Sequence, residues 1–194
     1  MLSFIAAVFF LLITPGPGVL SIAGVGVAFG VAPGLRYLAG LLLGNNLVGL
    51  MVITGLAASA LAVPGLREVL LIASVAYLSW LALRIARSGN RIGFIEQTHS
   101  PGFIDGVLLQ LINPKAYVVN TALFTGFALW PNDWWFEVAV KLALFNLLWL
   151  PIHLLWLWAG VSLRRLDLSD ATQSRINISM ATAMMAVVLL ALLS

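Results

Sequence analysis

The amino-acid sequence predicts an all-α integral membrane protein with six transmembrane helices, arranged as two inverted three-helix repeats. Of its 194 residues, 62% are hydrophobic and only 9% are charged, whereas about 25% of the residues of a typical soluble domain are charged. The apolar segments are continuous, which predicts helices rather than a barrel, because barrel strands alternate apolar and polar residues. A third observation, a repeat between the two halves of the chain, predicts the internal symmetry.

Six segments are long and apolar enough to form these helices, since a transmembrane helix needs about 20 predominantly apolar residues. They are residues 2–29, 37–63, 66–86, 102–129, 135–161 and 175–193. The first segment is broken at 14–18 and the fourth at 113–115, where proline motifs interrupt the helix. Helices 1 and 4 are therefore each expected to consist of two half-helices.

The two proline breaks belong to a repeat with an offset of 99 positions. Residues 3–15 are SFIAAVFFLLITP, and residues 102–114 are GFIDGVLLQLINP. Each half contains three predicted spans, and because three is odd, the second half is inserted upside down relative to the first. The predicted organisation is a first repeat over 1–86, a cytoplasmic loop over 87–101 and a second repeat over 102–194.

The basic residues orient the predicted bundle, because cytoplasmic loops of membrane proteins carry an excess of Lys and Arg. The loops after the first, third and fifth spans carry Arg36, Arg84, Arg87, Arg91, Arg164, Arg165 and Arg175. The opposite face carries Arg67, beside Glu68, and Lys141 lies just inside the fifth span. We therefore expect the N- and C-termini to lie outside the cell.

The first break is the segment Pro15-Gly16-Pro17-Gly18. Proline removes a backbone donor and clashes with the preceding helical turn, so this segment is expected to open the helix rather than only bend it. The exposed backbone groups then need partners where bulk water is absent. A kink that aids packing is one interpretation. We favour a binding site, because a second break follows in the other half of the chain.

The second break is Asn113-Pro114-Lys115. Lys115 lies about 13 residues into its span, roughly 20 Å from the cytoplasmic end at 1.5 Å per residue. A charge at this depth costs about 2.5–3.5 kcal/mol on insertion scales, so it should point toward a partner or a watery cavity. Snorkelling is the alternative. The other predicted spans contain no acidic residue at matching depth, which favours a partner from outside, such as a substrate carboxylate.

Further polar residues lie within the predicted spans. They are Asn45, Asn46, Gln110, Asn120, Asn146 and His153, and Asn46 and Asn146 are matched between the halves. Buried amides commonly only bridge helices. Asn45 and Asn46 are favoured as site residues because two adjacent amides face different sides of a helix. His153 could carry a proton, although a lone histidine in a span is more often a packing residue.

The residue types present exclude several functional classes. Cysteine is absent, which removes disulfides and thiolate metal sites. The chain has no motif for a nucleophile, an acid/base pair or a metal, so we expect neither an enzyme nor a cofactor. An ion channel or a metal-cation exporter remains the alternative to a transporter of small molecules. Hard or borderline cations need clusters of oxygen or imidazole ligands, and His99 and His153 are the only histidines of the sequence. The net charge of +3 does not indicate nucleic acid binding.

Two glycine motifs predict close helix approach. Gly26 and Gly30 are separated by three residues, as are Gly40 and Gly44. Such motifs support packing within a bundle or between the copies of a homodimer, and the sequence leaves both open.

At these residues the chain resembles the lysine-exporter (LysE/RhtB) family of bacterial amino-acid exporters. Thr14-Pro15-Gly16-Pro17 is similar to the PGP signature of the family's first span, and Asn113-Pro114-Lys115-Ala116 matches its NPKA motif. Other similar positions are Gly34, Arg36, Gly40, Gly44, Tyr77, Leu78 and Arg84. The chain departs from the family at Gly18 and at Asn45-Asn46, where other members often carry different polar or acidic residues.

The resemblance implies a multi-pass protein of the bacterial cytoplasmic (inner) membrane that exports amino acids or close derivatives, driven by the proton gradient. Combined with the residue pattern, it predicts that the two broken helices meet near the midplane. Lys115 and the amides exposed at 15–18 would bind a carboxylate. Asn45, Asn46 and Asn113 would bind the amino or side-chain groups of the substrate. Rocking of one half against the other would then provide alternating access.

Overall fold

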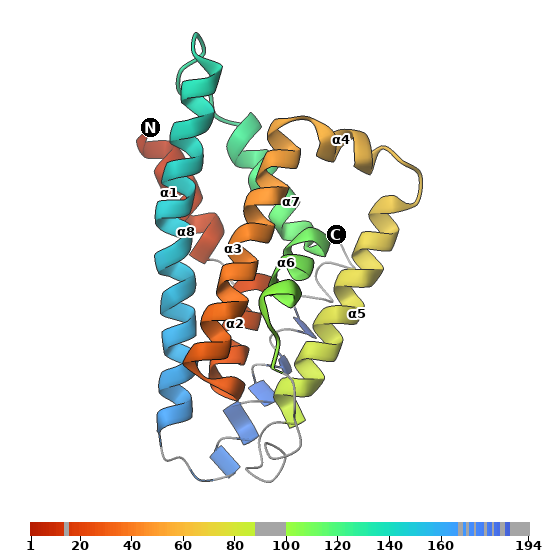
Figure 1. Ribbon diagram of the computed structural model, residues 1–194, viewed down its shortest axis with the longest axis vertical. Helices are drawn as coiled ribbons and strands as arrows, with labels where there is room; N and C mark the ends of the chain where they lie inside the picture. The colour runs from red at the N-terminus through yellow and green to blue at the C-terminus, as the bar shows by residue number, and fades with distance from the viewer. Residues whose placement is uncertain are drawn as a thin grey trace.

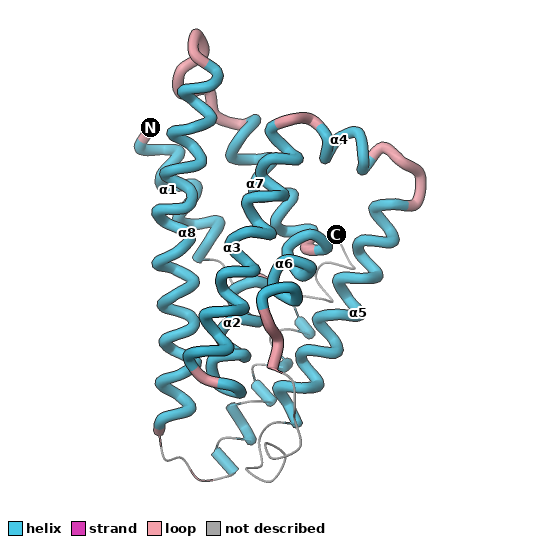
Figure 2. The backbone as a smooth tube through the Cα atoms, viewed as in Figure 1, coloured by secondary structure: helices cyan, strands magenta, loops and turns pink. Residues whose placement is uncertain are grey.

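The computed structural model describes residues 1–13, 16–87, 100–166 and short pieces beyond, namely 169, 171–172, 174–176, 178–179, 181–182 and 185–186. Within these residues the secondary structure is helical, with no strand. The helices are α1 (Leu2–Ile13), α2 (Pro17–Phe29), α3 (Val31–Ile53), α4 (Leu56–Leu61), α5 (Leu66–Arg87), α6 (Phe103–Ile112), α7 (Pro114–Thr125) and α8 (Trp134–Arg165). Figure 2 shows the loops that join them. The predicted all-helical class is confirmed.

The two longest helices, α3 and α8, lie side by side and run in opposite directions (Figure 1). By length and composition, Val31–Ile53 and Trp134–Leu163 are each able to cross a membrane. The pair α1 and α2 passes the same test as one span bent by 50°. Most of the predicted sixth span, 175–193, and most of the loop over 87–101 lie outside the described residues.

The second span differs from its prediction as a single helix over 37–63. It begins earlier, at Val31, and α3 ends at Ile53. Gly55 follows with a φ of 76°, in the left-handed region that glycine adopts most easily at the end of a helix. The short helix α4 then lies across the end of the bundle (Figure 1).

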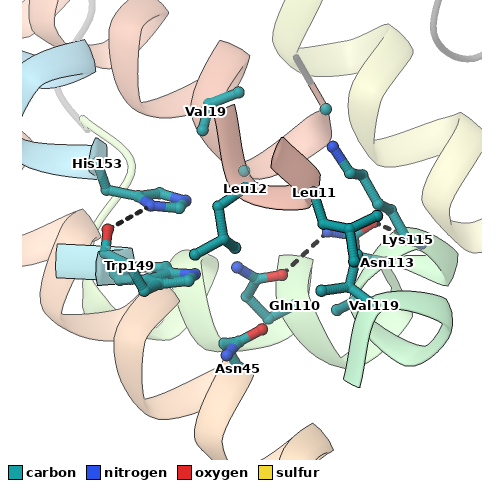
Figure 3. A pocket seen from close by; sticks show the side chains of 13 residues that line it. Leu11, Leu12, Val19, Asn45, Gln110, Asn113, Lys115, Val119, Trp149 and His153 are labelled. Atoms are coloured by element: carbon teal, nitrogen blue, oxygen red, sulfur yellow. Dashed lines mark hydrogen bonds between the residues drawn. The ribbon is translucent and has the colours of Figure 1, made fainter. Parts of the chain in front are cut away.

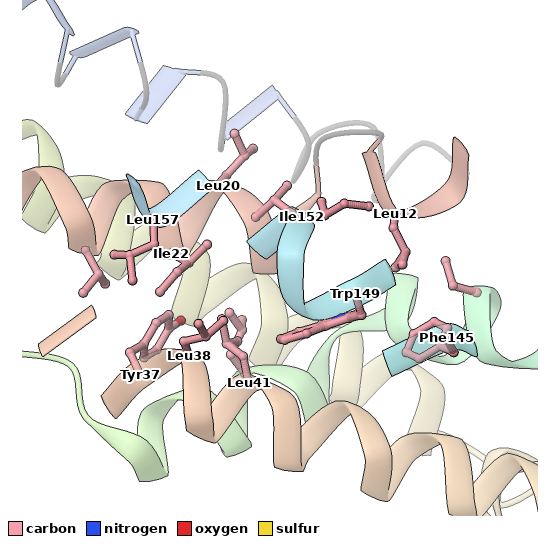
Figure 4. Packing of buried hydrophobic residues seen from close by; sticks show 14 of the residues in the cluster. Leu12, Leu20, Ile22, Tyr37, Leu38, Leu41, Phe145, Trp149, Ile152 and Leu157 are labelled. Atoms are coloured by element: carbon pink, nitrogen blue, oxygen red, sulfur yellow. The ribbon is translucent and has the colours of Figure 1, made fainter. Parts of the chain in front are cut away.

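The core is apolar and lies where α2, α3 and α8 meet (Figure 4). Its largest fully buried side chains include Trp149, Tyr37 and Phe145. The outer surface of α8 is apolar too, since Trp135 is 75% exposed and Trp158 is 67% exposed. Large apolar side chains on both sides of a helix are typical of a protein surrounded by lipid.

Several glycines allow backbones to touch at the helix crossings. A Cβ on Gly44 of α3 would lie 2.8 Å from the carbonyl oxygen of Val107 in α6, and one on Gly40 would overlap the carbonyl group of Phe103. A Cβ on Gly26 of α2 would lie 2.9 Å from the carbonyl oxygen of Leu157 in α8. These motif glycines therefore serve packing within the bundle.

Substitution of Gly106 is expected to destabilise the α3–α6 crossing. Gly106→Ala would place a Cβ 2.7 Å from the amide nitrogen of Leu41 and overlapping the carbonyl oxygen of Tyr37. Because the obstacle is backbone, the helices must separate, which costs about 1–3 kcal/mol. Thermal unfolding in detergent checks this. Gly102→Ala is the matched control, because its Cβ would meet only Asp105 Oδ2 at 3.8 Å, and equal melting temperatures for the two variants would contradict the prediction.

One amide pair joins the two long helices symmetrically. Asn46 Nδ2 donates to Asn146 Oδ1 at 2.9 Å, and Asn146 Nδ2 donates to Asn46 Oδ1 at 2.9 Å. Each amide also donates to the carbonyl four residues earlier, that of Leu42 or Leu142. The two asparagines are the residues that the sequence matches between the halves, and here they bridge helices.

Lys141 holds the loop between α7 and α8. Its side chain is 1% exposed and lies 2.7 Å from Glu137 Oε1. Its ammonium also donates to the carbonyl oxygens of Phe124, at 3.2 Å, and Phe127. Glu137 Oε2 in turn accepts from the amide of Leu129 at 2.7 Å. The ion pair of Glu137 and Lys141 therefore orders the loop that follows α7.

Candidate functional site

A small cavity of about 40 Å³ lies where α1, α2, α3, α6, α7 and α8 meet (Figure 3). Its polar lining residues are Asn45, Gln110, Asn113, Lys115 and His153. The apolar side chains around them include Leu11, Leu12, Val19, Val119 and Trp149. Since both proline-containing segments border this cavity, it is the candidate functional site.

The junction between α6 and α7 is built by Asn113 and Pro114. Pro114 occupies the first position of α7, where its missing N–H is not needed. Asn113 is extended, with φ −78° and ψ 106°, and its side chain accepts a hydrogen bond from the amide of Lys115 at 3.1 Å. The sequence Asn-Pro-Lys thus ends one helix, caps the next and places Lys115 in its first turn.

The junction before α2 is built in a related way. Gly16 is the N-cap of α2, and Pro17 occupies its first position. A Cβ on Gly16 would lie 2.6 Å from Lys115 Cδ and 3.0 Å from Lys115 Nζ. Glycine at this position therefore lets the half-buried Lys115 side chain lie against the backbone of the first break.

Two helices begin at the cavity, since Gly16 caps α2 and Asn113 caps α7. The N-terminus of a helix carries a partial positive charge and unsatisfied amide donors. Lys115 adds a full positive charge at the same place. The electrostatics of this side of the cavity therefore favour an anion such as a carboxylate.

Asn45 supplies a further donor. Its side chain is 4% exposed, and its Oδ1 accepts from Asn120 Nδ2 at 3.3 Å. Asn120 is oriented by a second hydrogen bond to the carbonyl oxygen of Ala116. Asn45 Nδ2 has no hydrogen-bond partner among the described residues. A buried donor without a partner is costly, and here it belongs to a residue that lines the cavity.

Gln110 and Asn113 form a linked amide pair. Asn113 Nδ2 donates to Gln110 Oε1 at 3.0 Å, which turns Gln110 Nε2 away from the junction (Figure 3). A Cβ on Gly18 would lie 3.3 Å from Gln110 Nε2 and 3.5 Å from His153 Nε2. Glycine at position 18 therefore keeps the cavity open between these two side chains.

The structure brings together five of the residues that the sequence predicts for a binding site, namely Gly16, Gly18, Asn45, Asn113 and Lys115. Pro17 and Pro114 begin the two half-helices beside it. Asn46 does not line the cavity, because its amide pairs with Asn146. Pro15 lies outside the described residues.

Among the lining residues that the sequence did not assign to a binding site are Gln110, Trp149 and His153. The repeat offers a signal for one of them. At its offset of 99 positions, Leu11 corresponds to Gln110 and Gly16 corresponds to Lys115, and all four residues line the cavity. His153 was marked only as a polar residue within a span, and no signal marks Trp149; both come from the middle of α8.

Membrane-capable helices that meet at a cavity with several polar residues in its lining are typical of a helical membrane protein. The family model of the LysE type translocator matches residues 9–194, and the chain belongs to this family. The resemblance to the lysine-exporter family seen in the sequence motifs is thereby confirmed. No curated protein and no solved structure matches the chain.

Proposed function

We propose that this protein is a secondary transporter that exports amino acids or close derivatives across the bacterial cytoplasmic membrane by proton-coupled alternating access. The observation that carries the proposal is the cavity at the two breaks, where Lys115, two helix N-termini and the amide of Asn45 converge. Membership of a translocator family supports the same class of function.

The substrate carboxylate binds at the positive side of this cavity. Lys115 Nζ provides the charge, and the amides at the start of α2, beside Gly16, provide further donors. Asn45 Nδ2 gains a partner when a carboxylate or a polar side chain arrives. Asn113 and Gln110 provide amide groups for the rest of the substrate, and Leu12 and Val119 are among the apolar residues that contact its side chain.

The volume of the cavity implies movement during transport. A water molecule needs roughly 10–15 Å³ of such space, so about 40 Å³ holds a few waters but no amino acid. Under the proposal, the present arrangement is a closed state, and the half-helices separate on one side of the membrane to admit the substrate.

An inverted repeat of six spans provides the mechanism for this movement. The matched pair Asn46 and Asn146 forms reciprocal hydrogen bonds between α3 and α8, as two equivalent residues on a two-fold axis would. The matched residues Gly16 and Lys115 also meet at the cavity. Both observations support rocking of one half against the other about this axis. The basic residues of the odd-numbered loops lead us to expect both termini outside the cell.

Ligand-dependent thermal stability of the purified protein tests the proposed function. The probes are the twenty proteinogenic amino acids and homoserine, each at a high millimolar concentration. A substrate present at 100 times its dissociation constant stabilises the folded state by about 2.7 kcal/mol, so we expect one group of amino acids to raise the melting temperature.

The matched controls are the decarboxylated analogues of the same amino acids, which keep the amine and the side chain. They should leave the melting temperature unchanged. Stabilisation by none of the amino acids, with divalent metal ions stabilising instead, would contradict the proposal and favour a metal-cation exporter.

A further inference from the structure

We propose that His153 is the residue at which proton binding and substrate binding exclude each other. The neutral imidazole accepts a hydrogen bond from the substrate ammonium at Nε2, and protonation of Nε2 releases the substrate. This inference rests on the proposed function as an amino-acid exporter and assigns the group that couples export to the proton gradient.

The hydrogen bond of His153 determines which ring nitrogen is available. His153 is 3% exposed, and its Nδ1 lies 2.9 Å from the carbonyl oxygen of Trp149. A carbonyl oxygen can only accept, so Nδ1 carries the hydrogen in this arrangement. In the neutral ring Nε2 is then an acceptor. Figure 3 shows this nitrogen on the opposite side of the ring from the Trp149 carbonyl oxygen. A Cβ on Gly18, which also lines the cavity, would lie 3.5 Å from it.

Packing holds the ring in this direction. The imidazole stacks on the indole of Trp149, with ring centroids 3.5 Å apart and an interplanar angle of 14°. Trp149 itself is 2% exposed and belongs to the apolar core. A histidine that only filled space would not need its second nitrogen directed at a polar cavity.

The other charged and titratable groups near His153 differ from it in charge or in position. Among the described residues that line the cavity, Lys115 of α7 is the charged one, and Asn45 of α3 and Gln110 of α6 are uncharged amides. The lining residues from α1 and α2 are apolar or glycine. Tyr37 lies two turns from Asn45 along α3 and belongs to the buried core (Figure 4). Lys141 lies three turns from His153 along α8 and is paired with Glu137.

The cavity therefore combines one cation and one neutral base. Figure 3 places Lys115 and His153 on opposite sides of the cavity. A zwitterionic amino acid is complementary to this arrangement, with its carboxylate toward Lys115 and its ammonium toward His153 Nε2. When Nε2 is protonated, it becomes a donor, and the cavity holds two cations. The substrate ammonium then loses its acceptor and is repelled.

The charge balance of a transport cycle follows from this exclusion. A proton from outside binds Nε2 when the cavity opens outward, and the zwitterion leaves. The proton dissociates from Nε2 into the cytoplasm when the cavity opens inward, and the next zwitterion binds. Each cycle exports one neutral zwitterion, imports one proton and moves one net positive charge inward.

The experiment uses the full-length protein in liposomes, with an equimolar mixture of ¹⁴C-labelled neutral L-amino acids as the probe. Two rates are measured: transport driven by an imposed pH gradient, and exchange of labelled for unlabelled amino acids without a gradient. Exchange requires substrate binding and movement but no proton transfer. The wild-type protein is expected to perform both, with exchange becoming slower at a pH low enough to protonate Nε2 of His153.

His153→Gln retains a neutral polar group near the position of Nε2 and cannot titrate. We expect exchange to be slower than in the wild type, because the acceptor of the substrate ammonium is replaced, but still measurable and independent of pH. Gradient-driven transport should fall at least tenfold more than exchange does. Lys115→Met is the comparison variant, which should lose both activities because it lacks the carboxylate-binding charge. His153→Asn, which retains a donor for the Trp149 carbonyl, replaces the glutamine variant if that variant is not monodisperse, with the same expected loss of coupling.

Gradient-driven transport by His153→Gln at the wild-type rate would overturn the assignment of His153 while leaving the proposed function intact. An equal loss of exchange and of gradient-driven transport, in a variant that melts like the wild type, would also overturn the assignment of proton coupling to His153. His153 would then serve substrate binding alone. Absence of both activities in the wild-type protein would overturn the proposed function and this inference with it.

Discussion

Lys115→Met is expected to reduce amino-acid transport by roughly 30-fold or more, with the protein still folded. Removing one member of a desolvated charge pair costs about 2–5 kcal/mol in binding, and each 1.36 kcal/mol is a factor of ten. Methionine retains an unbranched side chain that fits against Gly16, where the lysine stem now lies. The effect should therefore come from the lost charge rather than from altered packing. Transport in proteoliposomes and thermal stabilisation by amino acids are the measurements.

Arg175→Gln is the matched control for loss of a positive charge. Arg175 is exposed and lies outside the cavity, so its replacement should leave the transport rate unchanged. Wild-type export by Lys115→Met would show that the carboxylate has another binding group. An equal loss in both variants would indicate a general effect of charge on insertion into the membrane.

Lys141→Met is expected to lower the free energy of unfolding by about 1–3 kcal/mol, the usual cost of leaving hydrogen-bond acceptors without their donor. The substitution leaves the carboxylate of Glu137 and the carbonyl oxygens of Phe124 and Phe127 without their shared donor. Phe4 should be affected too, because it packs edge-to-face on Phe127 with ring centroids 5.5 Å apart. Thermal unfolding in detergent measures the effect.

The double variant Lys141→Met, Glu137→Gln separates the charge from the packing. If the uncompensated carboxylate causes most of the loss, the double variant should be more stable than Lys141→Met alone, since the remaining glutamine is neutral. A single variant as stable as the wild type would show that the loop after α7 is held by other contacts.

The elements that could be predicted from the sequence depend on local covalent chemistry or on composition. The helix end before Pro114 follows from the missing N–H and the ring of proline, and α6 does end at Ile112. The apolar length of α3 and α8 follows from composition. The left-handed turn at Gly55 was missed, because a glycine within an apolar run gives no signal that distinguishes a helix end from a packing site.

The residues of the cavity were only partly predictable, because neighbouring positions on a helix point in different directions. Asn45 and Asn46 have the same chemistry and adjacent numbers, yet Asn45 lines the cavity and Asn46 pairs with Asn146. The partner helix determines which of them faces the cavity. Gln110 and His153 were expected to bridge or pack, since a single buried amide or imidazole has the same sequence signature in either role.

The sequence by itself determined that this protein is helical and embedded in a membrane, that a helix ends before Asn113-Pro114 and that the chain belongs to the LysE type translocator family. These properties depend on composition, proline geometry and short motifs, which act within one segment. Only the tertiary structure decided which polar groups meet. Lys115 lies against Gly16, Asn45 is left with an unused donor, and His153 directs Nε2 at the same cavity. These contacts join segments far apart in the chain, so they depend on how the helices pack rather than on the order of their residues.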